Sequence, residues 1–299
     1  MIRSFLFVPA NVPRRIEKAL SLVGNAAADA VILDLEDSVA PSDKPPSRDA
    51  VVAALGRTWK SLLYVRVNAP STAYCYADLV ATVRKGVDGI VVPKIESAAD
   101  LHAIDWLLAA LERERGLAEG SLDLMPQIET AAGVQRVDRI LQARNLRPYR
   151  GPWRVKRACF GAADYAHDVG LSPTLEEDEL ADARARIVLA SRAAGLENPI
   201  DSPWFHFKET AAFARALERS RRGGFQGRCC VHPDQIGPVN EAYRPTAGEV
   251  AAAERIVAAF GEAEKRGAAA IQVDGQMIDY PVAHRAQALL DAARSLERK

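Results

Sequence analysis

Short apolar stretches alternate with amphipathic stretches along most of the chain. The apolar stretches are rich in Val, Ile and Leu and have the length of buried β-strands. They predict strands at Ser4–Pro9, Ala30–Leu35, Leu63–Asn68, Gly89–Pro93, Leu124–Glu129, Arg157–Gly161, Pro199–Trp204 and Arg228–His232. Between them, apolar residues recur at helical spacing, for example in Arg14–Leu22, Ala98–Leu111 and Asp178–Ala194.

This alternation predicts an α/β protein with a parallel sheet. Eight strand–helix units over about 240 residues are typical of a (β/α)8 TIM barrel, which we expect in residues 1–245. An open, doubly wound sheet is the alternative, but no Gly-x-Gly-x-x-Gly turn follows the first strand. We therefore favour the barrel.

Residues 246–299 form a C-terminal helical extension that the barrel does not require. The capping box of Thr246 and Glu249 begins a helix that we expect to end near Lys265. After it we expect an irregular stretch, Ala268–Tyr280, and a last helix from Pro281 to near Leu296. We expect the extension to pack on the barrel or on a neighbouring subunit.

The composition is that of a globular protein without net charge. Among 299 residues, 39 Lys and Arg balance 39 Asp and Glu, so nothing favours binding to nucleic acid or to an anionic membrane. No apolar run reaches the ~18 residues of a membrane-spanning helix. The four cysteines form no CxxC pair and are expected to fill the core. We expect a soluble, cytoplasmic protein.

Polar side chains gather where the predicted strands end. The active site of a TIM barrel forms at the carboxyl ends of its strands. The residues at these ends are Asp34, Glu36, Asp37, Arg66, Asn68, Lys94, Glu129, Asp164 and His232. The opposite ends carry no comparable set, so the sequence places the active site at this rim.

Glu129 and Asp164 are candidate metal ligands, because they follow neighbouring strands and offer hard oxygen atoms. Mg²⁺ takes one or two carboxylates and keeps its other positions for water and substrate. No His/Cys cluster suits zinc. The alternative is that such carboxylates only cap the helices that follow the strands.

Arg66 and His232 each allow two interpretations. An arginine in an apolar strand needs an anionic partner, which is either Glu36 or the carboxylate of a substrate. Beside the metal pair we favour the substrate. His232 is either a site residue or a strand-end histidine bonded to the backbone.

A group of basic residues begins the first two predicted helices. Its members are Arg14, Arg15, Lys18, Lys44 and Arg48. They form either a solvated face or a binding site for the phosphates of a large cofactor.

Short motifs follow one another along nearly the whole chain. They are Phe7–Asn11, Ala30–Val39, Arg66–Asn68, Val92–Glu96, Gln127–Thr130, Asp164–Ala166, Cys230–Pro233 and Asp274–Asp279. In this order they resemble the citrate lyase β-subunit-like family. That family includes malyl-CoA and citramalyl-CoA lyases and is related to the divalent-metal keto-acid aldolases.

The resemblance implies a reversible, Mg²⁺-dependent cleavage of a 3-hydroxyacyl-CoA thioester. The products would be acetyl-CoA, or a related acyl-CoA, and a 2-keto acid. The metal ligands of the family correspond to Glu129 and Asp164, and its substrate-binding arginine corresponds to Arg66. Glu36 and Asp37 match positions that hold metal-bound water or orient the site. We expect CoA to bind Arg14, Lys18, Lys44 and Arg48.

The resemblance also gives the extension a role. It identifies Asp279 as an acid/base group that enters the site of a neighbouring subunit, and it implies a homo-oligomer, a trimer or hexamer. From its position alone, Asp279 is equally suited to cap the helix near Pro281.

Other functions remain open. The chain could be the β subunit of a citrate lyase complex that acts on a carrier-protein thioester, a thioesterase, or a non-catalytic barrel that binds CoA. Ala163 stands where many relatives carry an acidic or amide residue. Malyl, citramalyl and citryl thioesters all remain candidate substrates.

Overall fold

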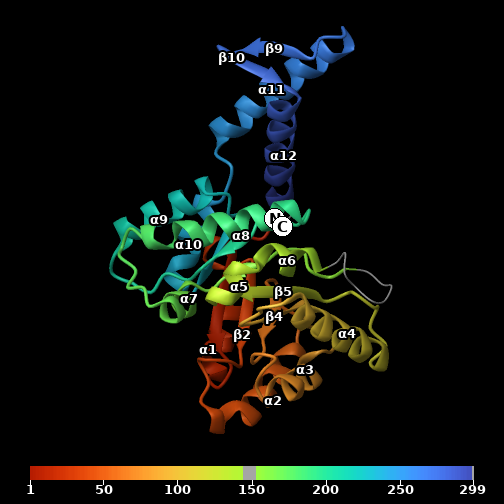
Figure 1. Ribbon diagram of the computed structural model, residues 1–299, viewed down its shortest axis with the longest axis vertical. Helices are drawn as coiled ribbons and strands as arrows, with labels where there is room; N and C mark the ends of the chain where they lie inside the picture. The colour runs from red at the N-terminus through yellow and green to blue at the C-terminus, as the bar shows by residue number, and fades with distance from the viewer. Residues whose placement is uncertain (144–152, 298–299) are drawn as a thin grey trace. The chain divides into compact units, whose positions relative to one another are not determined.

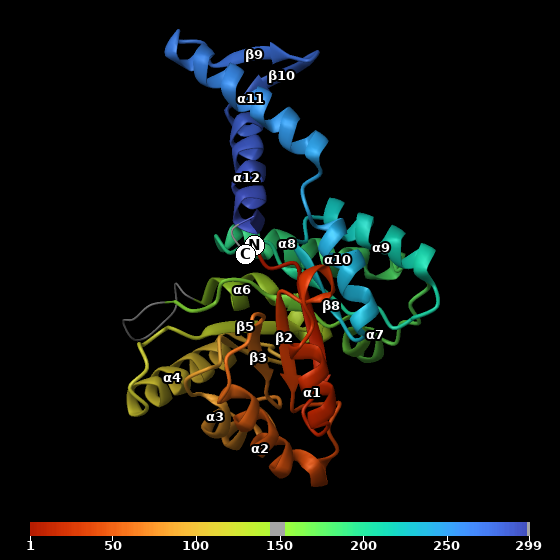
Figure 2. The same ribbon diagram turned by 180° about the vertical axis from the view of Figure 1, so that it is seen from behind.

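Eight parallel strands in sequence order close into a barrel, with β1 paired to both β2 and β8 (Figure 1). The computed structural model describes residues 1–143 and 153–297. The view from behind shows α1, α3 and α4 on the outside of the strands (Figure 2). The predicted (β/α)8 barrel is confirmed.

The strands are β1 Ser4–Pro9, β2 Ala30–Asp34, β3 Leu62–Arg66, β4 Gly89–Val92, β5 Asp123–Ile128, β6 Cys159–Phe160, β7 Ile200–Asp201 and β8 Gly227–Cys230. The helices of the barrel are α1 Pro13–Leu20, α2 Lys44–Leu55, α3 Cys75–Thr82, α4 Ala98–Glu114, α5 Ala131–Gln135, α6 Val137–Leu141, α7 Ala162–Val169, α8 Ala181–Ala193, α9 Thr210–Arg222 and α10 Ile236–Ala242. Short 3₁₀ helices lie at Gly24–Ala26, Pro41–Asp43, Asp178–Leu180 and Pro233–Gln235.

The barrel interior is a packed core. One cluster takes a buried side chain from every strand: Phe5, Ile32, Tyr64, Val91, Met125, Cys159, Ile200 and Cys229. All four cysteines are buried and free, as core residues are expected to be. Strands buried on both faces read as continuous apolar runs, which is why the sequence located all eight.

Most strands end within two residues of their predicted bounds, but β6 and β7 have only two residues each and are much shorter than predicted. β6 covers Cys159–Phe160 rather than Arg157–Gly161, and β7 covers Ile200–Asp201 rather than Pro199–Trp204. Just after β7, Pro203 has no N–H to donate to a neighbouring strand. The N–H of Ser202 is also diverted, since it donates to Oδ1 of Asp201 at 2.8 Å.

The chain divides into two compact units, Ile2–Ala242 and a second unit that begins at Tyr243 and includes Met1. In the second unit α11, Ala247–Lys265, begins with the predicted capping box, and α12 covers Tyr280–Glu297. No helix among the described residues has the length and apolar character needed to cross a membrane.

The expectation of an irregular stretch between these helices is wrong. A hairpin lies there, with β9 at Ala270–Val273 paired antiparallel to β10 at Gln276–Asp279. Its turn is Asp274-Gly275, with φ of 50° and 80°, and Asp-Gly is a strong signal for a two-residue hairpin. Each strand has only four residues, which is too short for alternation to stand out.

The hairpin predicts opposite effects for two adjacent residues of β10. Ile278 is fully buried against Phe260 and Ala283, whereas the side chain of Met277 is 67% exposed. We expect Ile278→Ala to destabilise this unit by about 2–4 kcal/mol and Met277→Ala to be nearly neutral. Hydrogen exchange of the α11 and α12 amides measures this, and equal effects of the two substitutions would contradict the hairpin.

Candidate active site

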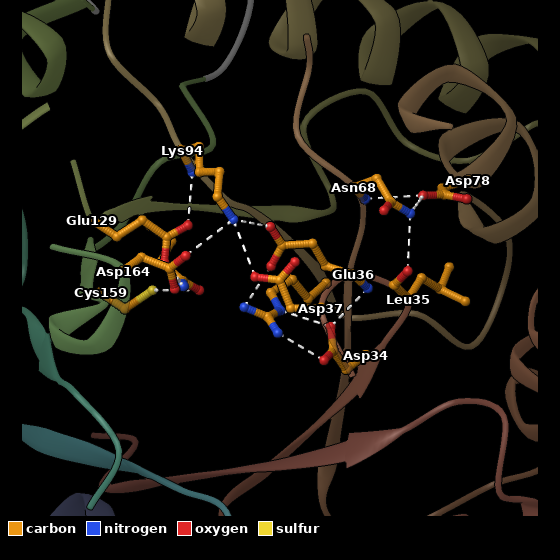
Figure 3. A network of polar contacts seen from close by, with 12 residues as sticks. Asp34, Leu35, Glu36, Asp37, Asn68, Asp78, Lys94, Glu129, Cys159 and Asp164 are labelled. Atoms are coloured by element: carbon orange, nitrogen blue, oxygen red, sulfur yellow. Dashed lines mark hydrogen bonds and ion pairs between the residues drawn. The ribbon is translucent and has the colours of Figure 1, made fainter. Parts of the chain in front are cut away.

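Apart from His232, the predicted rim residues come together at the carboxyl end of the barrel (Figure 3). Asp34 and Arg66 are the last residues of β2 and β3, and Lys94 follows β4 by two residues. Glu129 directly follows β5, and Asp164 lies in the first turn of α7. Parallel strands bring their carboxyl ends to one edge, so residues far apart in the sequence meet here.

Arg66 is held by two carboxylates of the protein. Its Nε and Nη2 donate to the two carboxylate oxygens of Asp34, each at 2.7 Å, and Nη1 lies 2.7 Å from Glu36 Oε2. Burial alone would raise the pKa of Asp34, but the guanidinium outweighs it and holds that pKa below its usual range. From the sequence we favoured a substrate carboxylate over Glu36 as the partner of Arg66. The structure shows Glu36 and also Asp34, which was not foreseen and whose bidentate bond is the stronger contact.

Lys94 lies at the centre of the carboxylates. Its Nζ donates to Glu36 Oε1, and lies 3.2 Å from Asp37 Oδ2 and 3.3 Å from Asp164 Oδ1. Its backbone N–H donates to Glu129 Oε1 at 2.9 Å. Burial lowers the pKa of Lys94, but the surrounding acids outweigh it and raise that pKa above its usual value. The ammonium therefore stays charged.

Glu129 is the most deeply buried of these acids, with no exposed surface. Its second oxygen accepts a hydrogen bond from Nε2 of Gln127. Burial, together with the negative charges of Glu36 and Asp164, raises the pKa of Glu129 from 4.5 to about 8. A Cβ at position 161 would lie 2.2 Å from Glu129 Oε2, so the close approach of the two strands requires Gly161.

The donor set fits a hard divalent cation. The carboxylates of Asp34, Glu36, Asp37 and Asp164 form ion pairs with Arg66 and Lys94, and the carboxyl group of Glu129 lies buried within the influence of both cations. Among the described residues no three His, Cys, Asp or Glu side chains form a complete metal centre. A site with two carboxylates that leaves positions for water and substrate suits Mg²⁺ rather than zinc.

A cavity of about 330 Å³ opens at this rim. Its wall includes Arg66 and Asp164, together with the exposed ring of Phe205. Glu129 is absent from the wall, but its neighbours Gln127 and Gly161 line it. The arrangement can bind a small anionic ligand and place it beside a cation.

Comparison with known proteins shows the family of the chain. The family model of the HpcH/HpaI aldolase/citrate lyase proteins matches residues 3–233. The chain belongs to this family. It is 33% identical over 295 residues to the citrate lyase subunit beta of Leuconostoc mesenteroides subsp. cremoris, covering 98% of this chain and 93% of that protein.

A second sequence relative and a solved structure are also similar to the chain. The L-malyl-CoA/beta-methylmalyl-CoA lyase of Rhodobacter capsulatus is 33% identical over 313 residues, covering 97% of this chain and 94% of the relative. The structure of CitE from Mycobacterium tuberculosis in complex with magnesium, acetoacetate and coenzyme A superposes with a TM-score of 0.75. It is 30% identical and covers 98% of both chains.

Two of the basic residues expected to bind CoA have other partners. Lys44 is buried, and its Nζ donates to the carbonyl oxygens of Leu35 and Glu36 at 2.9 and 3.0 Å. Arg48 donates to the buried carboxylate of Asp78 at 2.7 Å. These contacts connect the two side chains to the loops after β2 and β3, and CoA binding by Lys44 and Arg48 stays a prediction. Arg14 and Lys18 are exposed on α1, where CoA binding stays a prediction.

Asp279 and His232 make local contacts. Asp279 Oδ1 accepts the N–H of Val282 at 3.2 Å and so caps the start of α12. Nδ1 of His232 accepts the N–H of Asp234 at 3.3 Å, and the ring is half exposed. For His232 the backbone-bonded interpretation is the one the structure shows. The acid/base role of Asp279 stays a prediction.

The roles of Lys94 and Gln127 could not be read from the sequence. Lys94 was visible as a strand-end cation, but its φ of +53° and its contacts with three carboxylates were not. Gln127 gave no signal, because an amide inside an apolar strand is also found in ordinary cores. Lys94 contacts Glu129 and Asp164, and Gln127 contacts Glu129, so both residues contact proposed metal ligands.

The raised pKa of Glu129 predicts how stability depends on pH in the absence of metal. Between about pH 4.5 and pH 8 the folded protein keeps a proton on Glu129 that the unfolded chain has lost. The free energy of unfolding therefore falls as pH rises through this window. We expect Glu129→Gln, which cannot ionise, to gain in Tm relative to wild type as pH rises.

Thermal melts in a chelator at about pH 5 and about pH 9 measure this difference. Asp138→Asn, at an exposed carboxylate on α6, is the matched control and should follow wild type. A Tm difference for Glu129→Gln that stays flat or shrinks with pH would contradict the buried, protonated carboxyl group.

Proposed function

We propose that the protein is a Mg²⁺-dependent carbon–carbon lyase that reversibly cleaves a 3-hydroxyacyl-CoA thioester to an acyl-CoA and a 2-keto acid. The observation that carries the proposal is the placement of Arg66 and Asp164 on the wall of one cavity, with Glu129 buried beside Gln127 and Gly161 of the same wall. Relatives named as lyases and a neighbour bound to magnesium and coenzyme A support the same chemistry.

Glu129 and Asp164 are the proposed metal ligands. When bound, the cation supplies Lewis-acid stabilisation of the negative charge that develops on the hydroxyl oxygen. Arg66 keeps its charge beside Asp34 and lines the cavity, where it binds the carboxylate of the keto acid. Glu36 and Asp37 orient the site around Lys94.

Cleavage breaks the bond between the hydroxyl-bearing carbon and the carbon next to the thioester. The hydroxyl group gives up its proton to a base, which we assign to the carboxylate of Asp279 of a neighbouring subunit, and becomes the keto group, while the bonding electrons pass to the thioester fragment as an enolate. That enolate needs a proton at carbon, which we assign to Asp279 of a neighbouring subunit. This role requires a homo-oligomer, for which we expect a trimer or hexamer.

A second candidate function comes from the likeness to a citrate lyase subunit beta. In that case the thioester is carried by an acyl-carrier protein, and the chain works inside a complex. The chemistry at the rim is the same, and only the group that presents the thioester differs.

The proposal predicts cleavage that depends on Mg²⁺. Purified protein offered malyl-CoA, citramalyl-CoA and citryl-CoA should release a keto acid and acetyl-CoA from one of them, and chelator should abolish it. Glu129→Gln or Asp164→Asn should lower kcat/KM at least about 100-fold, because a lost ligand removes several kcal/mol of charge stabilisation. Products are followed by mass, with Asp138→Asn as the control.

Other products would change the assignment. Free CoA together with an intact hydroxy acid would make the protein a thioesterase. No turnover of the three CoA thioesters, with turnover of citryl carrier protein, would favour the citrate lyase subunit. Turnover that is insensitive to chelator would contradict the metal-dependent lyase.

Asp279→Asn separates the proposed chemistry from the helix cap. Asn caps helices as well as Asp, so the bond to the N–H of Val282 and the Tm should be kept. Loss of the acid should lower kcat by about 100-fold or more. Asp291→Asn, an exposed position on α12, is the control. Full activity of Asp279→Asn, or an active monomer in sedimentation, would contradict the role of Asp279 in a neighbouring site.

A further inference from the structure

One lysine makes contacts that a metal ion at this rim would also need. Nζ of Lys94 binds Glu36 and lies 3.3 Å from Oδ1 of Asp164. Its own N–H binds Oε1 of Glu129 at 2.9 Å. Lys94 therefore contacts both proposed metal ligands, one through its ammonium group and the other through its backbone (Figure 3).

The backbone of Lys94 is built for this position. Its φ of +53° lies in the left-handed region, which is uncommon and unfavourable for a residue with a side chain. Such a conformation persists where the surrounding contacts hold it, and such residues cluster at functional sites. Here the contacts are the N–H bond to Glu129 and the ammonium bonds to Glu36, Asp37 and Asp164.

The ammonium and a divalent cation use the same ligands. Each is a compact positive charge that seeks several oxygen atoms. A cation on the carboxylates of Glu129 and Asp164 would have to share Asp164 with Nζ of Lys94. Two positive charges that close together repel strongly, most of all in a half-buried site. Binding of the cation therefore requires the ammonium to give up its contact with Asp164.

We propose that Lys94 is an internal counter-cation that competes with the divalent metal for these carboxylates and so sets the metal affinity of the site. The inference depends on the proposed metal site at Glu129 and Asp164. It assigns Lys94 a positioning role that acts through those ligands. The carboxylates stay neutralised by the ammonium, at the cost of weaker metal binding.

The test is metal binding, measured without substrate. Free Mn²⁺ is followed by electron paramagnetic resonance in titrations of the full-length protein, and Mg²⁺ is then used to displace it. Lys94→Met removes the charge and should bind both ions at least about tenfold more tightly than wild type, because the competing cation is gone. Its Tm in chelator should fall, and the rise in Tm on adding Mg²⁺ should grow.

Two further variants complete the test. Lys94→Arg keeps the positive charge and should stay near the wild-type affinity. Lys156→Met removes an exposed lysine from a different cavity, lined by residues at the other end of the strands, and should change nothing. If Lys94→Met does not fold even with Mg²⁺, Lys94→Gln, which is neutral but keeps N–H donors, carries the same prediction.

The outcomes separate the two proposals. Unchanged or weaker metal binding by Lys94→Met, with wild type binding normally, would overturn the competition and leave the proposed function intact. Absence of metal binding in wild type and in every Lys94 variant would overturn the metal site itself. Tighter binding by Lys94→Met but not by Lys156→Met supports the competition.

Discussion

Five carboxylates crowd the carboxyl end of the barrel, and the structure around them depends on neutralising their repulsion. Arg66 forms ion pairs with Asp34 and Glu36. Lys94 forms ion pairs with Glu36, Asp37 and Asp164. Glu129 is buried beside them, and its burial together with the nearby negative charges raises its pKa to about 8. Removing one member of such a buried ionic network leaves an uncompensated charge, which is strongly destabilising. The same excess of negative charge makes the rim a place for a divalent cation.

The barrel supplies this crowding through its register. Asp34 lies opposite Arg66 across β2 and β3, so the bidentate ion pair joins two strand ends that both line the cavity. Lys44 and Arg48 hold the loops after β2 and β3. Lys44 bonds to the carbonyl oxygens of Leu35 and Glu36, and Arg48 bonds to Asp78. Gly161 lets β6 approach Glu129. Rigid strands and braced loops therefore hold the functional groups in place.

Much of this was predictable from the sequence, for physical reasons. Strands buried on both faces leave continuous apolar runs in the sequence. The polar residues that follow these runs, among them Asp34 and Asp164, identified the rim of the barrel. The details that depend on contacts between distant residues were not predictable. Lys44 looked like a solvated helix-start lysine but lies under the loop it holds. The order of residues does not indicate that Lys94 has a positive φ, or that Arg66 makes its bidentate contact with Asp34 rather than with Glu36. The hairpin at Asp274-Gly275 had a sequence signal, but its strands were too short for their alternation to be recognised.

Glu129 and Asp164 are the proposed ligands of a divalent cation at this rim, and this placement can be measured. Crystals of the protein soaked in Mn²⁺ and measured with anomalous diffraction test it most directly. We predict an anomalous peak between the two carboxylates, with the Lys94 ammonium displaced from Asp164. A peak elsewhere, or none at a Mn²⁺ concentration that supports activity, would contradict the account.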